Sequence, residues 1–198
     1  MSGIGRVGIV SQQLNSGSVT FNQTYTRSEN ISLQVWADTL VAQSVLFTID
    51  DAGYQRIQIL APGETLEPGA DLFIDTDGKS GAPVQQRASE PFIFSVYATD
   101  MFFNHVDSVN SGVINLASND NAYLITNNPV FNDIVFTNGV AEFSNFLIAQ
   151  GSIVVTASDT LDASLITQSV TIETAPAYIY SLITPETAQT GSAPGFSM

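Results

Sequence analysis

The residues of this chain with the clearest chemical potential are three aspartates that stand close together. Asp71, Asp75 and Asp77 precede Gly78 in the stretch DLFIDTDG. Hard oxygen ligands at alternate positions, followed by a turn glycine, are what a calcium loop needs. The twelve-residue loop with its distal glutamate is missing, so the cluster fits either an acidic surface turn or a calcium site. Calcium is the one cofactor that the sequence suggests.

Other polar residues stand where strands are expected to end. Asp100 and Asp159 each close an Ala-x-Asp stretch, where a carboxylate accepts the backbone N–H groups of the following turn. We expect Asn104 to serve a similar turn in a left-handed backbone conformation. Asp50 and Asp51 lie near a module junction, where they are hypothesised to clamp a cation together with a neighbouring loop.

Nothing in the sequence selects a catalytic residue. His105 is the only histidine, it stands beside two phenylalanines, and no nucleophile-elbow sequence accompanies it. The chain has no cysteine, which excludes thiol nucleophiles. Its 19 acidic residues offer many carboxylate pairs for glycoside hydrolysis, but no pair stands out. We predict that the protein is not an enzyme.

Aromatic residues provide the alternative of a sugar-stacking platform. Aromatic side chains are also common as half-buried strand residues, so both interpretations stay open. The residues concerned are Tyr25, Trp36, Tyr54, Tyr97, Tyr123, Tyr178 and Tyr180.

The charge of the chain limits its partners. With 5 basic and 19 acidic residues, the formal net charge at pH 7 is −14. Nucleic-acid binding needs clusters of Lys and Arg, so this class is excluded. The longest apolar runs are far shorter than the ~20 residues of a membrane-spanning helix, which predicts no membrane insertion.

Apolar residues recur at every second position between turn-forming stretches, which predicts strands with one buried face and almost no helix. Short strands at this spacing predict an all-β, antiparallel sandwich. We expect one alternating segment, with Val45, Phe47 and Ile49, to bury its apolar side. A single core between two sheets is expected to contain Phe94, Val96, Ile114, Leu116, Phe143, Val155 and Ile172.

The chain is similar to itself at an offset of 122 residues, without gaps, which is typical of tandem arrays. This frame predicts a partial module at 1–56, a complete module at 57–174, and a linker with the start of a following repeat at 175–198. The matches include Gly17 and Phe21 with Gly139 and Phe143, Ile31 and Leu33 with Ile153 and Val155, and Glu64, Thr65 and Gly69 with Glu186, Thr187 and Gly191.

Several stretches resemble the bacterial Ig-like repeats of invasin-type and intimin-type surface proteins. Pro91–Asp120 and Phe136–Asp159 contain the Ala-x-Asp, Gly-x-Ile-x-Leu and Gly-Val-Ala-x-Phe patterns, and Gly17–Asp38 looks like part of the same unit. Ala61–Pro83 is similar to an inter-repeat stretch of long secreted repeat proteins, although Asp71–Lys79 is longer than the usual loop. The resemblance implies tandem Ig-like modules on the cell surface or outside the cell.

The function implied is a non-catalytic segment of an adhesin, stalk or filament that extends from a surface or self-assembles. Two alternatives remain: a carbohydrate-binding or receptor-binding module, with surface glycans or receptors as partners, and an Ig-like accessory domain of a phage or virion particle. Such scaffolds serve many functions, so the strand pattern alone does not choose between them.

The repeat frame leaves residues 1–56 without the strands that correspond to 57–122. We therefore expect an uncovered apolar face and unpaired edges, which recruit partners. The predicted partner is a neighbouring copy, arranged head to tail, whose segment Ala177–Met198 packs against the partial module or adds a strand to it. Such a contact does not close and propagates as a filament.

Overall fold

The computed structural model describes residues 11–70, 77–119 and 133–177. Strands, turns and bends make up these residues, which contain no helix, so the predicted all-β class is confirmed. The strands are β1 (Glu29–Ala37), β2 (Leu40–Ile49), β3 (Arg56–Leu60), β4 (Glu64–Leu66), β5 (Lys79–Gly81), β6 (Gln86–Arg87), β7 (Phe92–Thr99), β8 (Val113–Ser118), β9 (Ile134–Val135), β10 (Val140–Asn145), β11 (Gly151–Asp159) and β12 (Gln168–Ala175).

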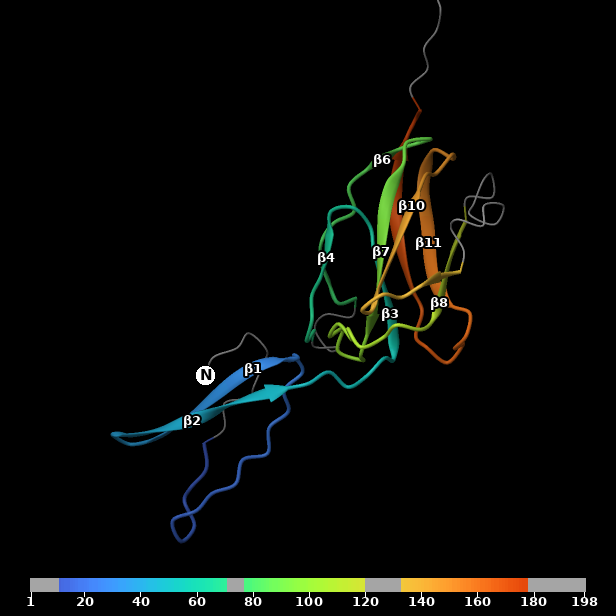
Figure 1. Ribbon diagram of the computed structural model, residues 1–198. Helices are drawn as coiled ribbons and strands as arrows, with labels where there is room; N and C mark the ends of the chain where they lie inside the picture. Colours follow the sequence, from blue (N-terminus) through green and yellow to red (C-terminus); the bar gives the residue numbers. More distant parts are fainter. Residues whose placement is uncertain (1–10, 71–76, 120–132, 178–198) are drawn as a thin grey trace, which may run out of the picture.

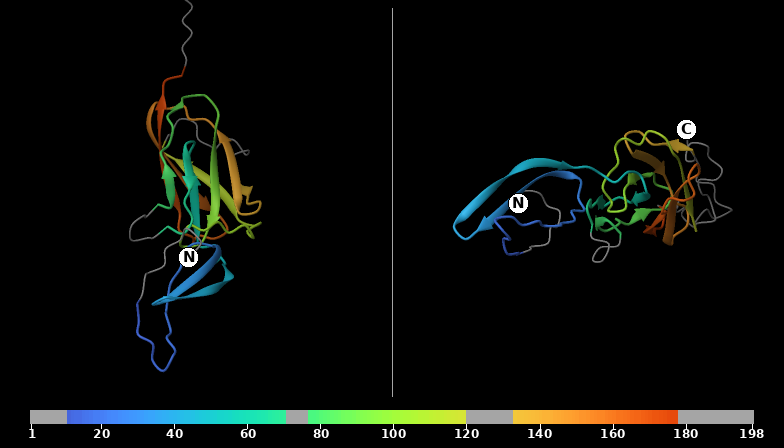
Figure 2. Two further views of the ribbon diagram at one scale, coloured as in Figure 1. Left: turned by 90° about the vertical axis from the view of Figure 1, so that its left-hand side faces the viewer. Right: turned by 90° about the horizontal axis from the view of Figure 1, so that it is seen from below.

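Two sheets pack face to face and form the larger part of the molecule (Figure 1). One sheet has the strand order β10-β7-β3, and the other has the order β6-β12-β11-β8-β9. We call this part, residues 56–175, the sandwich. The strands β4 and β5 form a short ribbon beside it, and β1 and β2 form a separate hairpin beyond one end (Figures 1 and 2).

The strand pairing is antiparallel except in one named pair. β6 runs parallel to β12, with Thr174 opposite Gln86 and Ala175 opposite Arg87. This differs from the purely antiparallel sandwich predicted from the sequence. β6 has two residues and lies at the edge of its sheet, just before the chain crosses to β7 in the other sheet.

The core lies between the two sheets and follows the alternation in the sequence. All seven residues predicted to line it are in one buried cluster, and none of them is more than 3% exposed. In β7, for example, Phe94 and Val96 are buried while Ile93 points outward, because successive side chains leave a strand on opposite faces.

The hairpin departs from this pattern. Val45 was expected on a buried face, but 80% of it is exposed, and Phe47 is also exposed. Among the described residues, no strand pairs with either edge of the hairpin, and Ile31 is the only residue that β1 buries. The alternation therefore predicted the strand correctly but not the exposure of its apolar side, which agrees with the uncovered apolar face expected for residues 1–56.

Two structural elements recur at the 122-residue offset. β1 falls end to end on β11 when it is shifted by this distance. The bridge between Asn15 and Ser18 falls on the bridge between Thr137 and Val140. The two central residues of each turn have positive φ, as two-residue hairpin turns require: 52° and 81° at Ser16 and Gly17, 49° and 70° at Asn138 and Gly139.

Candidate functional site: the joint between the hairpin and the sandwich

The densest group of polar contacts between the hairpin and the sandwich lies where the two parts meet. Here the turn at 100–104, which follows β7, contacts residues 26–28 before β1 and residue 52 after β2. We call this region the joint. The stem end of the hairpin meets the end of the sandwich there, and the hairpin extends sideways, across the long axis of the sandwich (Figures 1 and 2).

Asp100 is the centre of the joint and is buried. Its Oδ1 atom accepts hydrogen bonds from the backbone N–H groups of Phe102 (2.8 Å) and Asn104 (2.9 Å), which is the turn cap that the sequence predicted. Its Oδ2 atom accepts from the Asn104 side chain (2.9 Å) and from the backbone N–H of Ala52 (3.1 Å). One carboxylate thus shapes its own turn and holds the end of the hairpin.

Asn104 connects this carboxylate to the other stem of the hairpin. Its Oδ1 atom accepts a hydrogen bond from the backbone N–H of Ser28 at 2.9 Å, and its Nδ2 atom donates to the backbone carbonyl of Thr26 at 2.7 Å. A buried amide that both donates and accepts fixes the backbone direction of the segment that it contacts. Asp100 and Asn104 therefore bind both stems of the hairpin.

The loop at 68–69 completes the joint. The Thr26 hydroxyl donates to the carbonyl of Gly69 at 2.8 Å, and the Arg27 guanidinium donates to that of Pro68 at 3.2 Å. Gly69 has a φ of +78°, and a Cβ atom there would lie 2.5 Å from Cβ of Arg27. No larger residue fits. The sequence contained a signal for this position, because Gly69 matches Gly191 in the repeat frame.

The left-handed residue of the turn is Phe103, with a φ of 61°, so the prediction of this conformation for Asn104 is wrong. The Asp100 carboxylate binds the N–H groups on both sides of Phe103 and thereby sets the turn. Burial of the Phe103 ring offsets this backbone strain, because the residue is fully buried. Gly78 has no side chain and leaves room for the ring. The Arg56 guanidinium lies 4.4 Å from the centre of the ring, within the range of a cation–π contact.

Asp159 caps the corresponding turn after β11, as predicted. Its Oδ1 atom accepts from the backbone N–H groups of Leu161 (2.9 Å) and Val113 (3.2 Å), and its Oδ2 atom accepts from the hydroxyl of Tyr54 at 3.3 Å. The Tyr54 ring packs edge-on against Phe136, which belongs to the core. Residues just after the hairpin are thereby fastened to the sandwich as well.

Tyr54 gives this contact a pH dependence. Burial, followed by the charge of Asp159, raises the pKa of Tyr54 well above its ordinary value of 10.0. The folded state therefore keeps its proton where the unfolded state loses it, so stability falls as the pH rises above about 10. We expect the unfolding midpoint in denaturant to drop more steeply above this pH in the native protein than in Tyr54→Phe. Equal pH dependence of the two proteins would contradict the assignment.

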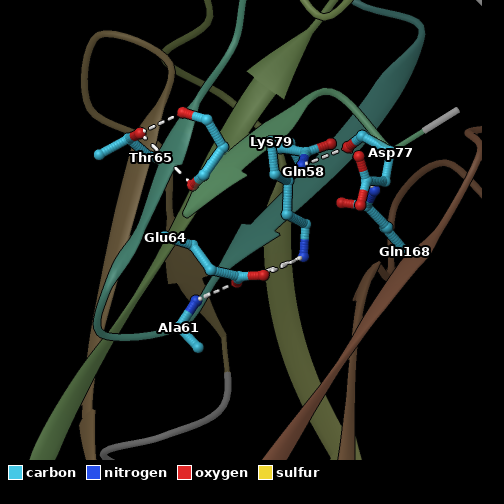
Figure 3. A network of polar contacts seen from close by, with 8 residues as sticks. Gln58, Ala61, Glu64, Thr65, Asp77, Lys79 and Gln168 are labelled. Atoms are coloured by element: carbon cyan, nitrogen blue, oxygen red, sulfur yellow. Dashed lines mark hydrogen bonds and ion pairs between the residues drawn. The ribbon is translucent and has the colours of Figure 1, made fainter. Parts of the chain in front are cut away.

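The predicted calcium cluster lies mostly outside the described residues, since Asp71 and Asp75 are not among them. The backbone carbonyl of Asp77 accepts hydrogen bonds from the side chains of Gln58 (2.8 Å) and Gln168 (2.9 Å), as Figure 3 shows. Within 11–70, 77–119 and 133–177, no three acidic or histidine side chains gather as metal ligands would. Calcium binding stays a prediction.

Figure 3 also shows the contacts of Glu64 and Thr65, the two residues that match Glu186 and Thr187 in the repeat frame. Glu64 in β4 and Lys79 in β5 form an ion pair at 3.4 Å, with side chains only 8% and 6% exposed. Glu64 also accepts a hydrogen bond from the backbone N–H of Ala61 at 2.8 Å, and Thr65 shares a hydrogen bond with Ser80 at 2.7 Å. These side chains fasten the β4–β5 ribbon.

The remaining candidate residues do not assemble into one site in the described ranges. His105 packs edge-on against Tyr97, and its Nε2 atom is buried without a hydrogen-bond partner. Asp51 accepts from the backbone N–H of Gly53 at 2.9 Å and so shapes a turn; the hypothesis of a cation clamp at Asp50 and Asp51 is untested.

The aromatic residues proposed as a platform lie on different elements. Tyr54 and Tyr97 are engaged in the contacts already described, Tyr25 donates a hydrogen bond to Glu29, and Trp36 is exposed on the hairpin. Tyr123, Tyr178 and Tyr180 lie outside the described residues. The platform stays a prediction.

Comparison with known proteins identifies no family. No family model matches the chain, and no curated protein matches it. Among solved structures, the chain is similar to the apo structure of Bacteroides uniformis beta-glucuronidase 3, with 14% sequence identity and a TM-score of 0.42. The match covers 76% of this chain but only 17% of that one. A likeness at this level carries no argument about activity.

Proposed function

We propose that this chain is a structural, non-catalytic segment of an extracellular or cell-surface protein of the adhesin, stalk or filament type. Its units are Ig-like modules related to the repeats of invasin-type and intimin-type proteins, stacked end to end. The two-sheet sandwich and the recurrence of a turn and a strand at a 122-residue offset support the module type. The described residues include no helix of the length and hydrophobicity needed to cross a membrane.

The joint is the observation that carries this proposal. Buried Asp100 and Asn104 bind both stems of the hairpin, so the two parts are fastened by specific hydrogen bonds and not by a flexible linker alone. The chain enters the sandwich at this end through β3 and leaves at the opposite end after β12 (Figure 1). Units whose connections lie at opposite ends can follow one another in a chain, which suits a protein that holds something away from a surface.

The repeat frame supports a second joint at the far end. Residues 148–150 and 174 fall on residues 26–28 and 52, which are the parts of the hairpin unit that the sandwich binds. Gly191 falls on Gly69, which the first joint needs for the close approach of Arg27. The same end of each unit would then bind the unit that follows.

The test compares Asn104→Ala with Asn110→Ala, a matched change in another loop. Asn104 makes two hydrogen bonds to the hairpin stem, each worth about 1 kcal/mol, so opening of the joint should become roughly 30-fold easier. We expect hydrogen exchange at Ser28 to accelerate by about this factor in Asn104→Ala only. Small-angle X-ray scattering should show one elongated shape for the native chain and a mixture of orientations for Asn104→Ala.

Exchange at core positions such as Val96 reports whether the sandwich itself stays folded. A native chain whose scattering already requires a freely swinging hairpin would refute the proposal. So would unchanged protection of Ser28 in Asn104→Ala while the sandwich remains intact.

A further inference from the structure

One face of the hairpin is apolar and, within the described residues, is exposed over most of its length. The register pairs Ile31 with Phe47 and Val35 with Ala42, which places these side chains on the same face because neighbours across a strand pair point the same way. We call this surface the open face. Besides Ile31, it includes Leu33, Val35, Leu40, Ala42, Val45 and Phe47. Val45 is 80% exposed, and Leu40 and Val35 are exposed as well.

The sandwich shows what covers the equivalent strands. β11, on which β1 falls in the repeat frame, presents Ile153 and Val155 to the core. β3 contacts both β11 and β12, and the backbone N–H of Ile57 donates to the carbonyl of Ile166 at 3.0 Å. Ile57 and Ile59 are fully buried there. Within the described residues, the hairpin has no strand in the place of β3.

The chain contains a second sequence of the β3 kind. Residues 179–183, with the sequence IYSLI, fall on residues 57–61, with the sequence IQILA, and Glu186-Thr187 follows as Glu64-Thr65 does. The segment 177–183 carries no charge, and the hairpin strands and their turn carry two, at Glu29, which pairs with Arg27, and at Asp38. In a chain of net charge −14, these are surfaces on which two copies can meet without repulsion.

The segment cannot reach the hairpin of its own chain. β12 ends with Ala175 at the end of the sandwich opposite the hairpin (Figure 1). The eight residues of β12 span about 26 Å at a strand rise of roughly 3.3 Å per residue. The four residues from Ala175 to Ile179 extend over at most about 14 Å. An occupant from the segment must come from another copy.

We propose that residues 179–183 of one copy cover the open face of the hairpin in a second copy, in the place that β3 takes against β11 and β12. This inference rests on the proposed function, because it uses the same modules and joins them between chains. The covering segment buries Val45 and its neighbours under its own apolar side chains, as β3 does across the core of the sandwich. Each copy offers one face and one segment, so the contact is head to tail and open-ended.

The test uses the full chain and a pair of neighbouring residues. Val45 and Leu46 are both exposed, at 80% and 64%, but Leu46 lies opposite Ser32 on the other face of the hairpin. Light scattering measures the mass of the native chain, Val45→Lys, Leu46→Lys and Ile179→Asp as a function of concentration. We expect the native chain and Leu46→Lys to grow beyond dimers, while Val45→Lys and Ile179→Asp stay monomeric.

Mixing provides the decisive observation. Val45→Lys keeps an intact segment, and Ile179→Asp keeps an intact open face, so an equimolar mixture should double in mass and grow no further. A native chain that stays monomeric at every concentration would overturn the inference and leave the proposed function untouched, because the joint is tested within one chain. Assembly that Val45→Lys abolishes and Ile179→Asp does not would also overturn it, since the hairpins would then pair with each other.

Discussion

Replacing Phe143 with alanine is expected to lower the free energy of unfolding of the sandwich by about 3–5 kcal/mol, the usual cost of deleting a buried aromatic side chain. Phe143 in β10 is fully buried and lies directly opposite Phe94 in β7. The two sheets close around both rings, so the surroundings cannot collapse easily into the space left behind. Denaturation in guanidinium chloride, followed by circular dichroism, measures the change.

The control for this variant is Ile93→Ala on the outer side of β7. Ile93 is next to Phe94 and opposite Ser144 but is exposed, so its loss should cost much less than that of Phe143. Similar losses for the two variants would contradict the assignment of Phe143 to the buried face and Ile93 to the exposed face.

Replacing Lys79 with methionine is expected to lower the free energy of unfolding by about 3–5 kcal/mol, because the charge of Glu64 would stay buried without its partner. The pair is nearly inaccessible to water, and Glu64 also holds the backbone N–H of Ala61. Thermal and guanidinium unfolding of Lys79→Met measure the loss.

Two further variants separate the buried charge from other effects. Adding Glu64→Gln to Lys79→Met should restore most of the stability, because a neutral amide oxygen can still accept from Ala61. Arg87→Met removes an exposed pair with Glu90 and should change stability by no more than about 1 kcal/mol. A double variant that is no more stable than Lys79→Met would show that methionine simply does not fit.

The core was predictable because, in a strand that a second sheet covers, the apolar residues at alternate positions face that sheet. Phe94 and Val96 are two residues apart in β7, Phe143 is two residues from Ala141 in β10, and all four lie on the inner face of their sheet. Val45 has the same spacing, and its strand was predicted for the same reason. Its burial was not predictable, because alternation states which residues share a face and not whether another element packs against that face.

The joint could be predicted only in part. The capping role of Asp100 is local, since its turn partners are two and four residues away. The bonds from Asn104 to Thr26 and Ser28 span 78 and 76 residues, and no local pattern indicates contacts at that distance. Glu64 and Lys79 are separated by a stretch that looks like a long loop, so no sequence pattern indicates that they lie side by side.

The position of the hairpin stems matters when the molecule is pulled. Both stems lie at the joint, and the turn between β1 and β2 points away from it (Figure 1). Tension applied through the two stems would open the hairpin like a zipper from the pair Glu29 and Ile49, one cross-strand bond after another. In the sandwich the chain enters and leaves at opposite ends, so the bonds between β3 and β7 resist together, in shear.

Asn104 changes the route of such a force. Because it holds Thr26 and Ser28 directly, tension that arrives from the N-terminal side passes through the amide into the turn after β7. The hairpin, which is the mechanically weaker part, then carries little of the applied force, and the sandwich carries most of it. The two hydrogen bonds of the Asn104 side chain thus transmit the force past the hairpin, and the strands β1 and β2 separate only after these bonds have broken.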